Sequence, residues 1–470
     1  MQAHSNNSSA PNLDQLFTAH LTTIAPIYAA AAARAGAGSL LIDAGHNQNY
    51  FRDDQGPNFR ANPYFTHWLP IGDAEHCALL LRDGKKPLLL FHQPRDYWHM
   101  PPADPTGFWL DQFDIRIVAD EEALARELAA ATSPDTLYLG PSSALPQNLG
   151  ITRSNVPAAL DYLDFHRAKK TAYEIETMRS ATRSAVKGHR AAAAAFAAGQ
   201  SEYQIHMAYL AASTQTERDV PYGNIVALNA HGSVLHYQHQ ERTLPDVHRS
   251  LLIDAGARCR GYAADITRTY AATLGRFADL VQALDLRQQQ ICAAIQPGMP
   301  YLELHVLAHQ LVAAVLQEIG VLRCSAQHAF AQGLTRAFLP HGLGHLLGIL
   351  THDAGGHLAD AAGKRAPPSP EYPMLRNTRT IAVDQVFTIE PGIYFIPMLL
   401  DEVRSSAAAA NINWQVVDEL LPYGGVRIED NVRVLEHGVE NFTRDAFVQL
   451  AERSDSQSAD SATRAHSRDG

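Results

Sequence analysis

The chain has 470 residues, 46% of them hydrophobic and 19% charged, with a formal net charge of −11. This length exceeds the size at which one hydrophobic core usually divides, so we expect an ordinary globular chain with two domains. The acidic balance and the lack of a basic block argue against nucleic acid as a partner. No apolar run approaches the roughly 18 residues of a membrane span. The N-terminus has no basic segment leading into an apolar one, so we expect neither a membrane partner nor a signal peptide.

The first third of the chain alternates helical and strand patterns. In order, these are an alanine-rich helix at 24–38, a strand at 39–45, two strands within 77–94 joined at a turn, a helix at 121–132 and a strand at 136–141. This pattern predicts a smaller α/β domain over residues 1–165, with no catalytic spacing in it. Its tryptophans Trp68, Trp98 and Trp109 are expected to pack in the core or at an interface.

From about residue 166 the pattern changes to helix pairs followed by strands, and this order occurs twice. The first set is helices at 167–199 and 201–214 with strands at 250–256 and 261–271; the second is helices at 277–295 and 301–319 with strands at 386–395 and 425–436. Ser201 and Gln204 fit a capping box at the second helix. We therefore expect a second domain over residues 166–450, built from two similar halves. The polar residues 451–470 are expected to form a disordered tail.

Each half carries two carboxylates in apolar strand settings: Asp254 in LLIDAG, Asp265 in AADITRT, Glu390 in FTIEPG and Glu429 in VRIEDN. An ionised carboxylate in a half-buried strand costs several kcal/mol unless it is paired or bound to metal. The sequence offers no four matched arginines, but a pair of divalent cations would balance these charges. Oxygen ligands with one imidazole suit Mn²⁺, Co²⁺, Fe²⁺ or Zn²⁺. Thr267 alternates onto the face of Asp265, where its hydroxyl could support a ligand.

Residues 338–356, FLPHGLGHLLGILTHDAGG, combine three histidines with five glycines. Histidine is the commonest metal ligand, and glycine allows close backbone approach. Taken alone, this run fits a ligand segment and a run of ordinary solvated or core histidines equally well.

Taken together, LLIDAG, ADITRT, HGLGHLLGILTHD, TIEPGIYF and VRIEDNV resemble the pita-bread metallopeptidases, the family of methionine aminopeptidase, aminopeptidase P, creatinase and prolidase. The insert at 355–380, the insert before NINWQVV and the N-terminal NPYFTHWLP and DYWH are similar to bacterial Xaa-Pro dipeptidases, or prolidases. The resemblance implies an α+β fold. A pita-bread catalytic domain with pseudo-twofold halves would follow the smaller α/β N-terminal domain.

The resemblance also implies a catalytic centre of two divalent metal ions per subunit, most commonly Mn²⁺. Its ligands would be Asp254, Asp265, His345, Glu390 and Glu429, with Asp265 and Glu429 bridging the two ions. The activity implied is hydrolysis of dipeptides with a C-terminal proline by a hydroxide formed between the metals.

The catalytic roles implied by the resemblance fall on three side chains. Glu390 would carry a proton to the leaving proline nitrogen, His352 would stabilise the oxyanion, and His341 would face the substrate. Arg376 would bind the substrate's C-terminal carboxylate, a task that suits a guanidinium. The other implied substrate-binding residues are His236, Arg427, Tyr222, Leu235 and Leu375.

Three alternatives remain open from the sequence. The chain could be an aminopeptidase P acting on longer peptides with proline second, although the inserts at 357–380 and 400–415 favour a narrower dipeptidase site. It could be a pita-bread domain that only binds proteins, although such domains usually lack the metal ligands. Phosphotriester hydrolysis could be a side activity. The resemblance further implies a homodimer, and the four scattered cysteines fit a cytoplasmic location.

Overall fold

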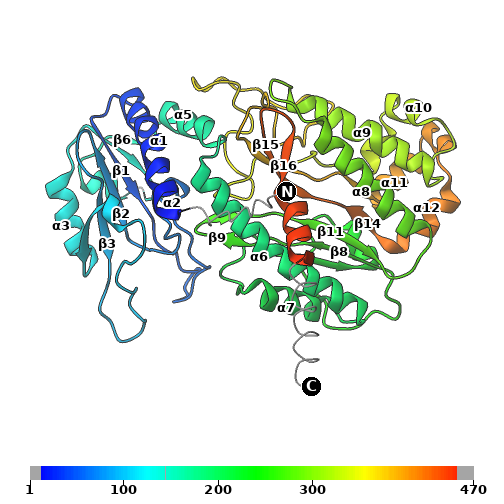
Figure 1. The fold of residues 1–470 in the computed structure, drawn as a ribbon, viewed down its shortest axis with the longest axis horizontal. Helices are drawn as coiled ribbons and strands as arrows, with labels where there is room; N and C mark the ends of the chain where they lie inside the picture. The colour runs from blue at the N-terminus through cyan, green and yellow to red at the C-terminus, as the bar shows by residue number, and fades with distance from the viewer. Residues whose placement is uncertain (1–11, 143, 453–470) are drawn as a thin grey trace, which may run out of the picture. The chain divides into compact units, whose positions relative to one another are not determined.

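The computed structural model describes residues 12–142 and 144–452, and Figure 1 shows its mixture of helices and sheets. This content agrees with the α+β class. The chain divides into two compact units. The first consists mainly of residues up to His166 with Lys170–Glu176, and the second mainly of residues from Thr177 onward. Of the expected tail, residues 453–470 lie outside the described residues.

The first unit is built on one six-stranded sheet in the order β4-β3-β2-β1-β5-β6. Strand β1 runs antiparallel to β2 and parallel to β5, so the sheet is mixed. Helices α1 and α3 lie on opposite faces of the sheet (Figure 1). The bounds are α1 (Leu13–Arg34), β1 (Ser39–Asp43), α2 (Pro63–Trp68), β2 (Ala78–Arg82), β3 (Leu88–His92), η1 (Leu110–Gln112), β4 (Asp114–Val118), α3 (Glu121–Ala131), β5 (Thr136–Leu139), α4 (Ala144–Asn148), β6 (Arg153–Ser154) and α5 (Pro157–Arg167).

Helix α1 differs from its sequence expectation because it begins well before residue 24. Over its full length it is the one described helix that is long and apolar enough to cross a membrane by those two measures. Its buried positions, which include Phe17, Leu21, Ile24 and Tyr28, recur at helical spacing and face the unit's interior. A core helix of a globular unit accounts for this pattern.

The first half of the second unit contains the elements α6 (Ala172–Ala197), α7 (Glu202–Ser213), β7 (Ile225–Leu228), η2 (Asn229–Ser233), β8 (Ser250–Asp254), β9 (Arg258–Cys259), β10 (Tyr262–Ala263) and β11 (Thr267–Ala271), although residues 172–176 at the start of α6 belong to the first unit. The predicted capping box of α7 is present, with Ser201 and Gln204 bonding reciprocally. Strand β7, which the sequence analysis did not anticipate, pairs with β8 and completes the three-stranded sheet β11-β8-β7.

The second half repeats the order of a helix pair followed by strands. It contains α8 (Arg276–Ala294), α9 (Tyr301–Glu318), α10 (Ala326–Ala331), η3 (Leu334–Ala337), β12 (Val386–Ile389), β13 (Gly392–Tyr394), α11 (Pro397–Arg404), η4 (Ala407–Asn411), α12 (Trp414–Leu420), η5 (Leu421–Tyr423), β14 (Gly425–Arg427), β15 (Asp430–Val434) and β16 (Val439–Asn441). Helices α8, α9 and α12 contribute to one apolar core with strand residues such as Ile393 and Val426.

Three strands predicted as continuous are interrupted, and each break holds a carboxylate. The breaks contain Asp265, Glu390 and Glu429. The backbone N–H of Glu390 donates to the carbonyl of Leu343, and that of Glu429 donates to the carbonyl of Thr267, so both leave their expected ladders. Hydrophobic patterning cannot reveal which segment accepts such a bond, and therefore the sequence predicted unbroken strands.

The two halves meet where β14 lies beside β11. The backbone N–H of Arg427 donates to Thr269 Oγ1 at 3.1 Å, and that hydroxyl donates to the Arg427 carbonyl at 3.0 Å. A β-bridge between Thr267 and Glu429 continues the contact. Carboxylates from both halves are thereby brought to one place.

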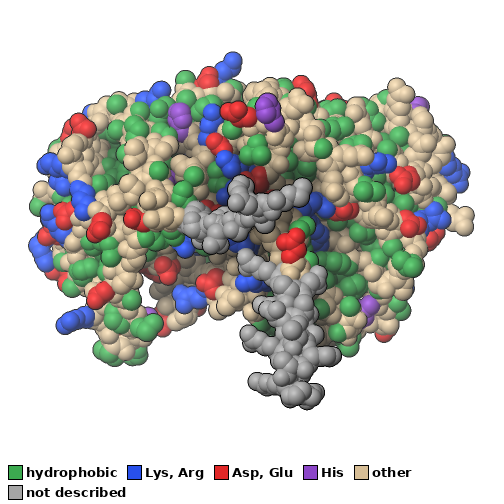
Figure 2. Space-filling view, in the orientation of Figure 1, with side chains coloured by type: hydrophobic (Ala, Val, Ile, Leu, Met, Phe, Trp, Pro, Cys, Tyr) green, Lys and Arg blue, Asp and Glu red, His purple; other side chains and the backbone are tan. Residues whose placement is uncertain are grey.

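Charged side chains of both signs are interspersed on the face of the molecule drawn in Figure 2. Among the described residues visible on that face, they form no single basic or acidic patch.

Candidate metal centre

The first two carboxylates are placed by one antiparallel ladder. Asp254 ends β8 and stands opposite Thr267, the first residue of β11. Asp265 lies two residues before Thr267, in the break between β10 and β11. The ladder register therefore fixes both carboxylates near the same end of the sheet.

His345 is held by backbone pairing of the glycine-rich segment with β12. Its N–H donates to Thr388 Oγ1 at 3.1 Å, and its carbonyl accepts from the Thr388 N–H at 3.0 Å. A Cβ on Gly344 would come within 2.1 Å of the Thr388 carbonyl oxygen. The glycine is needed for this close backbone approach. The close approach that the glycines allow is made here between Gly344 and β12.

Glu429 enters from the second half and is fixed by Thr267 in the first. The Thr267 hydroxyl donates to Glu429 Oε2 at 2.7 Å, which is the supporting role expected of this threonine. Because Thr267 also accepts the Glu429 backbone N–H, both the chain and the carboxylate of Glu429 are oriented.

The predicted ligands converge in the structure. Ligand atoms of Asp265, His345 and Glu429 all lie within 4.8 Å of one another, and the three residues are buried. His345 Nε2 is 3.4 Å from Asp265 Oδ2 and 3.5 Å from Glu390 Oε1. Asp254 and Glu390 line the same cavity.

The pKa values in this cluster are shifted because its carboxylates are buried away from water and lie close to one another. Burial raises the pKa of Glu390 to about 7 and that of Glu429 well above its usual range, and neighbouring carboxylates add to both shifts. Burial also raises the pKa of Asp254, against the opposing charge of Arg427. Burial acts on Asp265 in the same direction, but the hydrogen bond and charge of His345 bring its pKa below the usual value.

This donor set fits a divalent cation. Mutual repulsion of buried carboxylates is relieved by a positive ion among them, and four carboxylates with one imidazole supply hard oxygen donors plus one nitrogen. The His345 Nδ1 lies 3.0 Å from the carbonyl of Leu346, so Nδ1 carries the proton and Nε2 is left facing Asp265 and Glu390. A ligating imidazole is oriented in this way.

A hydrogen-bond chain links the carboxylates to His341. Arg427 donates from Nη2 to Asp254 Oδ2 at 2.7 Å, from Nη1 to the Tyr394 hydroxyl at 2.8 Å, and from Nε to Thr267 Oγ1 at 3.1 Å. The Tyr394 hydroxyl in turn lies 2.9 Å from His341 Nε2. Since His341 Nδ1 lies 2.8 Å from the Gly342 carbonyl, both ring nitrogens of His341 are engaged by the protein.

A cavity of about 410 Å³ opens over this cluster. Of the expected substrate-binding and catalytic residues, it is lined by Leu235, His236, His341, His352, Arg376 and Arg427. His352 packs edge-on against His345, with 4.4 Å between ring centroids. Burial lowers the pKa of His352 to about 4, with help from His345 and Arg376, so this ring is neutral at pH 7.

Two expected substrate-binding residues lie elsewhere. The Tyr222 hydroxyl bonds to the carboxylates of Asp254 and Asp265, so it contacts ligands rather than lining the cavity. Leu375 is buried in an apolar core cluster and borders a smaller neighbouring cavity of about 180 Å³.

Several residues around the site were not anticipated from the sequence. Tyr394 joins Arg427 to His341. Met374, Ile396, Met398 and Leu399 form an apolar wall of the cavity. An apolar residue in a strand or loop looks like ordinary core in one sequence, so no signal separated these residues from the rest.

Known proteins resemble this chain over most of its length. Residues 176–436 match the model of metallopeptidase family M24, and residues 15–165 match that of the Xaa-Pro dipeptidase N-terminal domain. The Xaa-Pro dipeptidase of Aeromonas hydrophila is 45% identical over 434 residues, covering 92% of this chain and 98% of the relative. That of Xanthomonas campestris is 45% identical over 439 residues, covering 93% and 99%.

Solved structures agree on the fold. A low-pH form of Escherichia coli aminopeptidase P superposes with a TM-score of 0.71 at 21% identity, covering 93% of this chain and 96% of that chain. A zinc-substituted product complex of the same enzyme gives a TM-score of 0.68 at 19% identity, covering 92% and 95%. The chain therefore belongs to metallopeptidase family M24, as a metal-dependent peptidase that groups with the bacterial Xaa-Pro dipeptidases.

Proposed function

We propose that this chain hydrolyses dipeptides whose second residue is proline. One observation carries the proposal: four carboxylates and an imidazole from both halves of the catalytic unit converge beneath a single cavity. The identity to named Xaa-Pro dipeptidases over more than nine-tenths of the chain supports a dipeptidase over an aminopeptidase P, which is similar only at the level of fold.

The metal content we propose is two divalent ions, with Mn²⁺ as the native metal. The residues that would hold them are Asp254, Asp265, His345, Glu390 and Glu429. When bound, such ions act as Lewis acids that lower the pKa of water and polarise a carbonyl oxygen.

The proton transfers fall to Glu390. Its pKa of about 7 reflects burial, and its position beside His345 places it inside the cavity. The leaving group is the secondary amine of proline, which must gain a proton as the peptide bond breaks. We assign this proton to the Glu390 carboxyl group.

Two histidines would act on either side of the scissile bond. His352 would donate to the developing oxyanion, and loss of one such donor typically costs about 10²–10³ in kcat. His341 is held through both nitrogens by Gly342 and Tyr394. Its contribution would be to shape the wall that faces the substrate.

Substrate orientation would come from the rim of the cavity. Arg376 offers a guanidinium for the free C-terminal carboxylate. Leu235 with His236 would face the residue before proline, and Arg427 would act through Asp254.

We further propose that the residues before 166 and those from 166 to 450 are separate domains, as supported by the two compact units.

We also propose a cytoplasmic homodimer. The first unit exposes a group of large apolar side chains on its loops, with Phe51 and Met100 each 94% exposed: Tyr50, Phe51, Tyr97, Trp98 and Met100. Trp68 and Trp109 are buried, whereas Trp98 is exposed and suits the interface role that the sequence left open for it. Light scattering tests the dimer.

The activity is tested by measuring proline release from Xaa-Pro dipeptides with protein of known metal content. We expect release from dipeptides and not from Xaa-Pro-Xaa tripeptides; the reverse preference would identify an aminopeptidase P. Asp265→Asn should lower metal content and turnover together. Full metal occupancy with near-normal turnover in this variant would refute the ligand assignment.

A further inference from the structure

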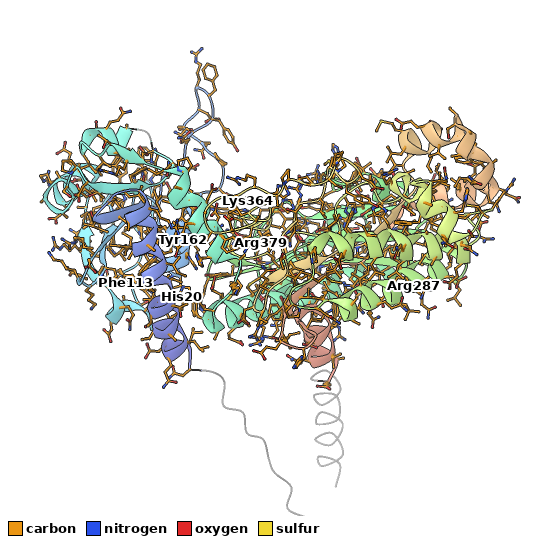
Figure 3. The ribbon with its side chains drawn as sticks, turned by 90° about the horizontal axis from the view of Figure 1, so that it is seen from above. His20, Phe113, Tyr162, Arg287, Lys364 and Arg379 are labelled. Carbon is orange, nitrogen blue, oxygen red and sulfur yellow. The ribbon has the colours of Figure 1, made fainter. Side chains whose placement is uncertain are left out.

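A second group of buried side chains that could hold a metal ion lies in the first unit, and none of its members lines the catalytic cavity. It comprises His20 of α1, His67 of α2 and Glu174 in the first turn of α6. One ligand atom from each lies within 4.8 Å of the other two, and all three residues are buried. Figure 3 labels His20 on α1. Three segments far apart in the sequence thus converge on one point.

The hydrogen bonds of His20 define which ring nitrogen carries the lone pair that could bind a cation. His20 Nε2 lies 2.8 Å from the backbone carbonyl of His67. A carbonyl oxygen only accepts, so Nε2 carries the proton and the lone pair of the neutral ring is on Nδ1. That atom lies 3.9 Å from Glu174 Oε2.

His67 is arranged in the same way. Its Nδ1 lies 3.0 Å from the Tyr28 hydroxyl, and its Nε2 lies 3.5 Å from Glu174 Oε1. Histidines that bind metals generally engage their other nitrogen with an oxygen of the protein, which fixes the ring. Both imidazoles here have that second contact.

The separations fit a small tetrahedral ion. Ligand bonds of about 2.0–2.1 Å place neighbouring ligand atoms about 3.3 Å apart in a tetrahedron. The observed separations are somewhat longer, at 3.5 Å from His67 Nε2 to Glu174 Oε1 and 3.9 Å from His20 Nδ1 to Glu174 Oε2, so each imidazole faces a different oxygen of the carboxylate. Two nitrogens and one carboxylate are a donor set that Zn²⁺ and Co²⁺ accept.

The charge states also suit a cation. Burial lowers the pKa of His20 to about 4, so the ring is neutral near pH 7. Burial would raise the pKa of Glu174, but His67, His20 and Lys170 together hold it below its usual range, so the carboxylate stays ionised. Lys170 balances part of that charge in the metal-free protein.

Without an ion, hydrogen bonds hold the cluster together. The Thr171 hydroxyl lies 2.9 Å from His20 Nδ1, and the Thr171 N–H donates to Glu174 Oε2 at 2.7 Å. Metal binding would replace the first of these bonds and leave the second in place. Thr171 is thus the group that an ion would displace from His20.

We propose that His20, His67 and Glu174 form a structural site for one divalent cation of the zinc type. The ion would tie α1, α2 and the first turn of α6 together within the first unit. It would be independent of the catalytic metals and of the proposed peptidase activity.

The test uses full-length protein in which Asp265→Asn and Glu429→Gln weaken the catalytic centre. Titration with Co²⁺ should give one tightly bound equivalent with the intense visible absorption of tetrahedral cobalt. Adding His67→Phe should abolish that spectrum, and His76→Phe, a matched change in the same unit, should leave it intact. Zn²⁺ should raise the unfolding temperature only where His67 is present.

A second measurement covers the case in which that background does not fold. Wild-type protein should hold one more equivalent of metal than its His67→Phe variant at equal dipeptidase activity. A folded background without tetrahedral cobalt, or equal metal content in wild type and His67→Phe, would show that the cluster is held by hydrogen bonds alone and would overturn the proposal.

Discussion

At the scale of single residues, Arg376 has the most specific assignment outside the metal ligands. It lines the cavity, and the Met374 beside it belongs to the apolar wall. Arg376→Ala should raise KM for free Xaa-Pro dipeptides by about 10-fold to 100-fold, because one charge-assisted hydrogen bond contributes about 1.5–3 kcal/mol. C-terminally amidated dipeptides, which lack the carboxylate, should be affected far less.

Arg336→Ala is the matched control for that measurement. Arg336 pairs with Glu371, which lies in the same insert (357–380) as Arg376. Arg336 itself does not line the catalytic cavity. Its loss should change KM equally little for both kinds of substrate. If Arg376→Ala raised KM equally for free and for amidated dipeptides, Arg376 would be a structural residue.

His189, a buried residue of α6, is one group expected to make the stability of the fold sensitive to acid. Burial lowers its pKa to about 3, so the folded chain leaves it neutral where the unfolded chain protonates it. Between about pH 6.5 and that lower value the unfolded state binds more protons, and stability falls as pH falls. For one such histidine the loss between pH 7 and pH 5 is about 2 kcal/mol.

The measurement is denaturant unfolding at both pH values for wild type and His189→Gln. The variant replaces the buried imidazole whose Nε2 lies 2.9 Å from the Ala255 carbonyl with a group of different shape, so it should be less stable at pH 7. It should also lose about 2 kcal/mol less on acidification than wild type does. Equal losses in both proteins would assign the acid sensitivity to other groups.

At the scale of elements, the position of His345 depends on the close approach of residues 338–356, the glycine-rich segment, to β12. A Cβ at Gly344 would overlap the Thr388 carbonyl oxygen, and backbone cannot move aside as a flexible side chain can. Gly344→Ala should therefore displace His345 and lower metal affinity and activity by about 10-fold or more.

Gly232→Ala provides the comparison, because the nearest atom to its added Cβ would be 3.5 Å away. That variant should keep its metal and its activity. Metal content and turnover of the two variants should be measured side by side. Normal metal binding by Gly344→Ala would mean that the segment tolerates the displacement.

The helices and strands also show which parts of the fold could be predicted from the sequence alone. Helices α6 to α9 and strand β8, which ends at Asp254, follow from periodicity and capping, and the five expected ligands do converge. The breaks at Glu390 and Glu429 could not be foreseen, because they depend on bonds to Leu343 and Thr267.

The residues that form the apolar wall of the cavity could not be identified from the sequence either. Met374 lies outside the described helices and strands, Met398 lies in the short helix α11, which the sequence analysis did not anticipate, and Tyr394 looks like any strand aromatic. Their roles follow from tertiary placement, which one sequence does not encode in local spacing.

At the scale of the whole molecule, metal removal should destabilise the chain. Without cations the carboxylates of Asp254, Glu390 and Glu429 are crowded together and shifted towards their neutral forms. A bound ion stabilises the folded state by mass action, by about 4 kcal/mol at a concentration 1,000 times its Kd. Chelation should thus lower the unfolding temperature by several degrees, and added Mn²⁺ should restore it.

The control for this measurement is the Asp265→Asn variant, whose unfolding temperature should respond much less to chelator. Thermal scans of both proteins, with and without metal, make the comparison. A wild-type chain indifferent to chelation would count against a cation among these carboxylates.

The bridge between Thr267 and Glu429 has a consequence for how the protein matures. Neither half of the second unit contains all five expected ligands. A nascent chain could therefore not bind its metal ions until the second half had been synthesised and had packed against the first. Ion uptake during refolding would then report the final docking event, and luminescence from a lanthanide probe should lag behind the recovery of helical signal.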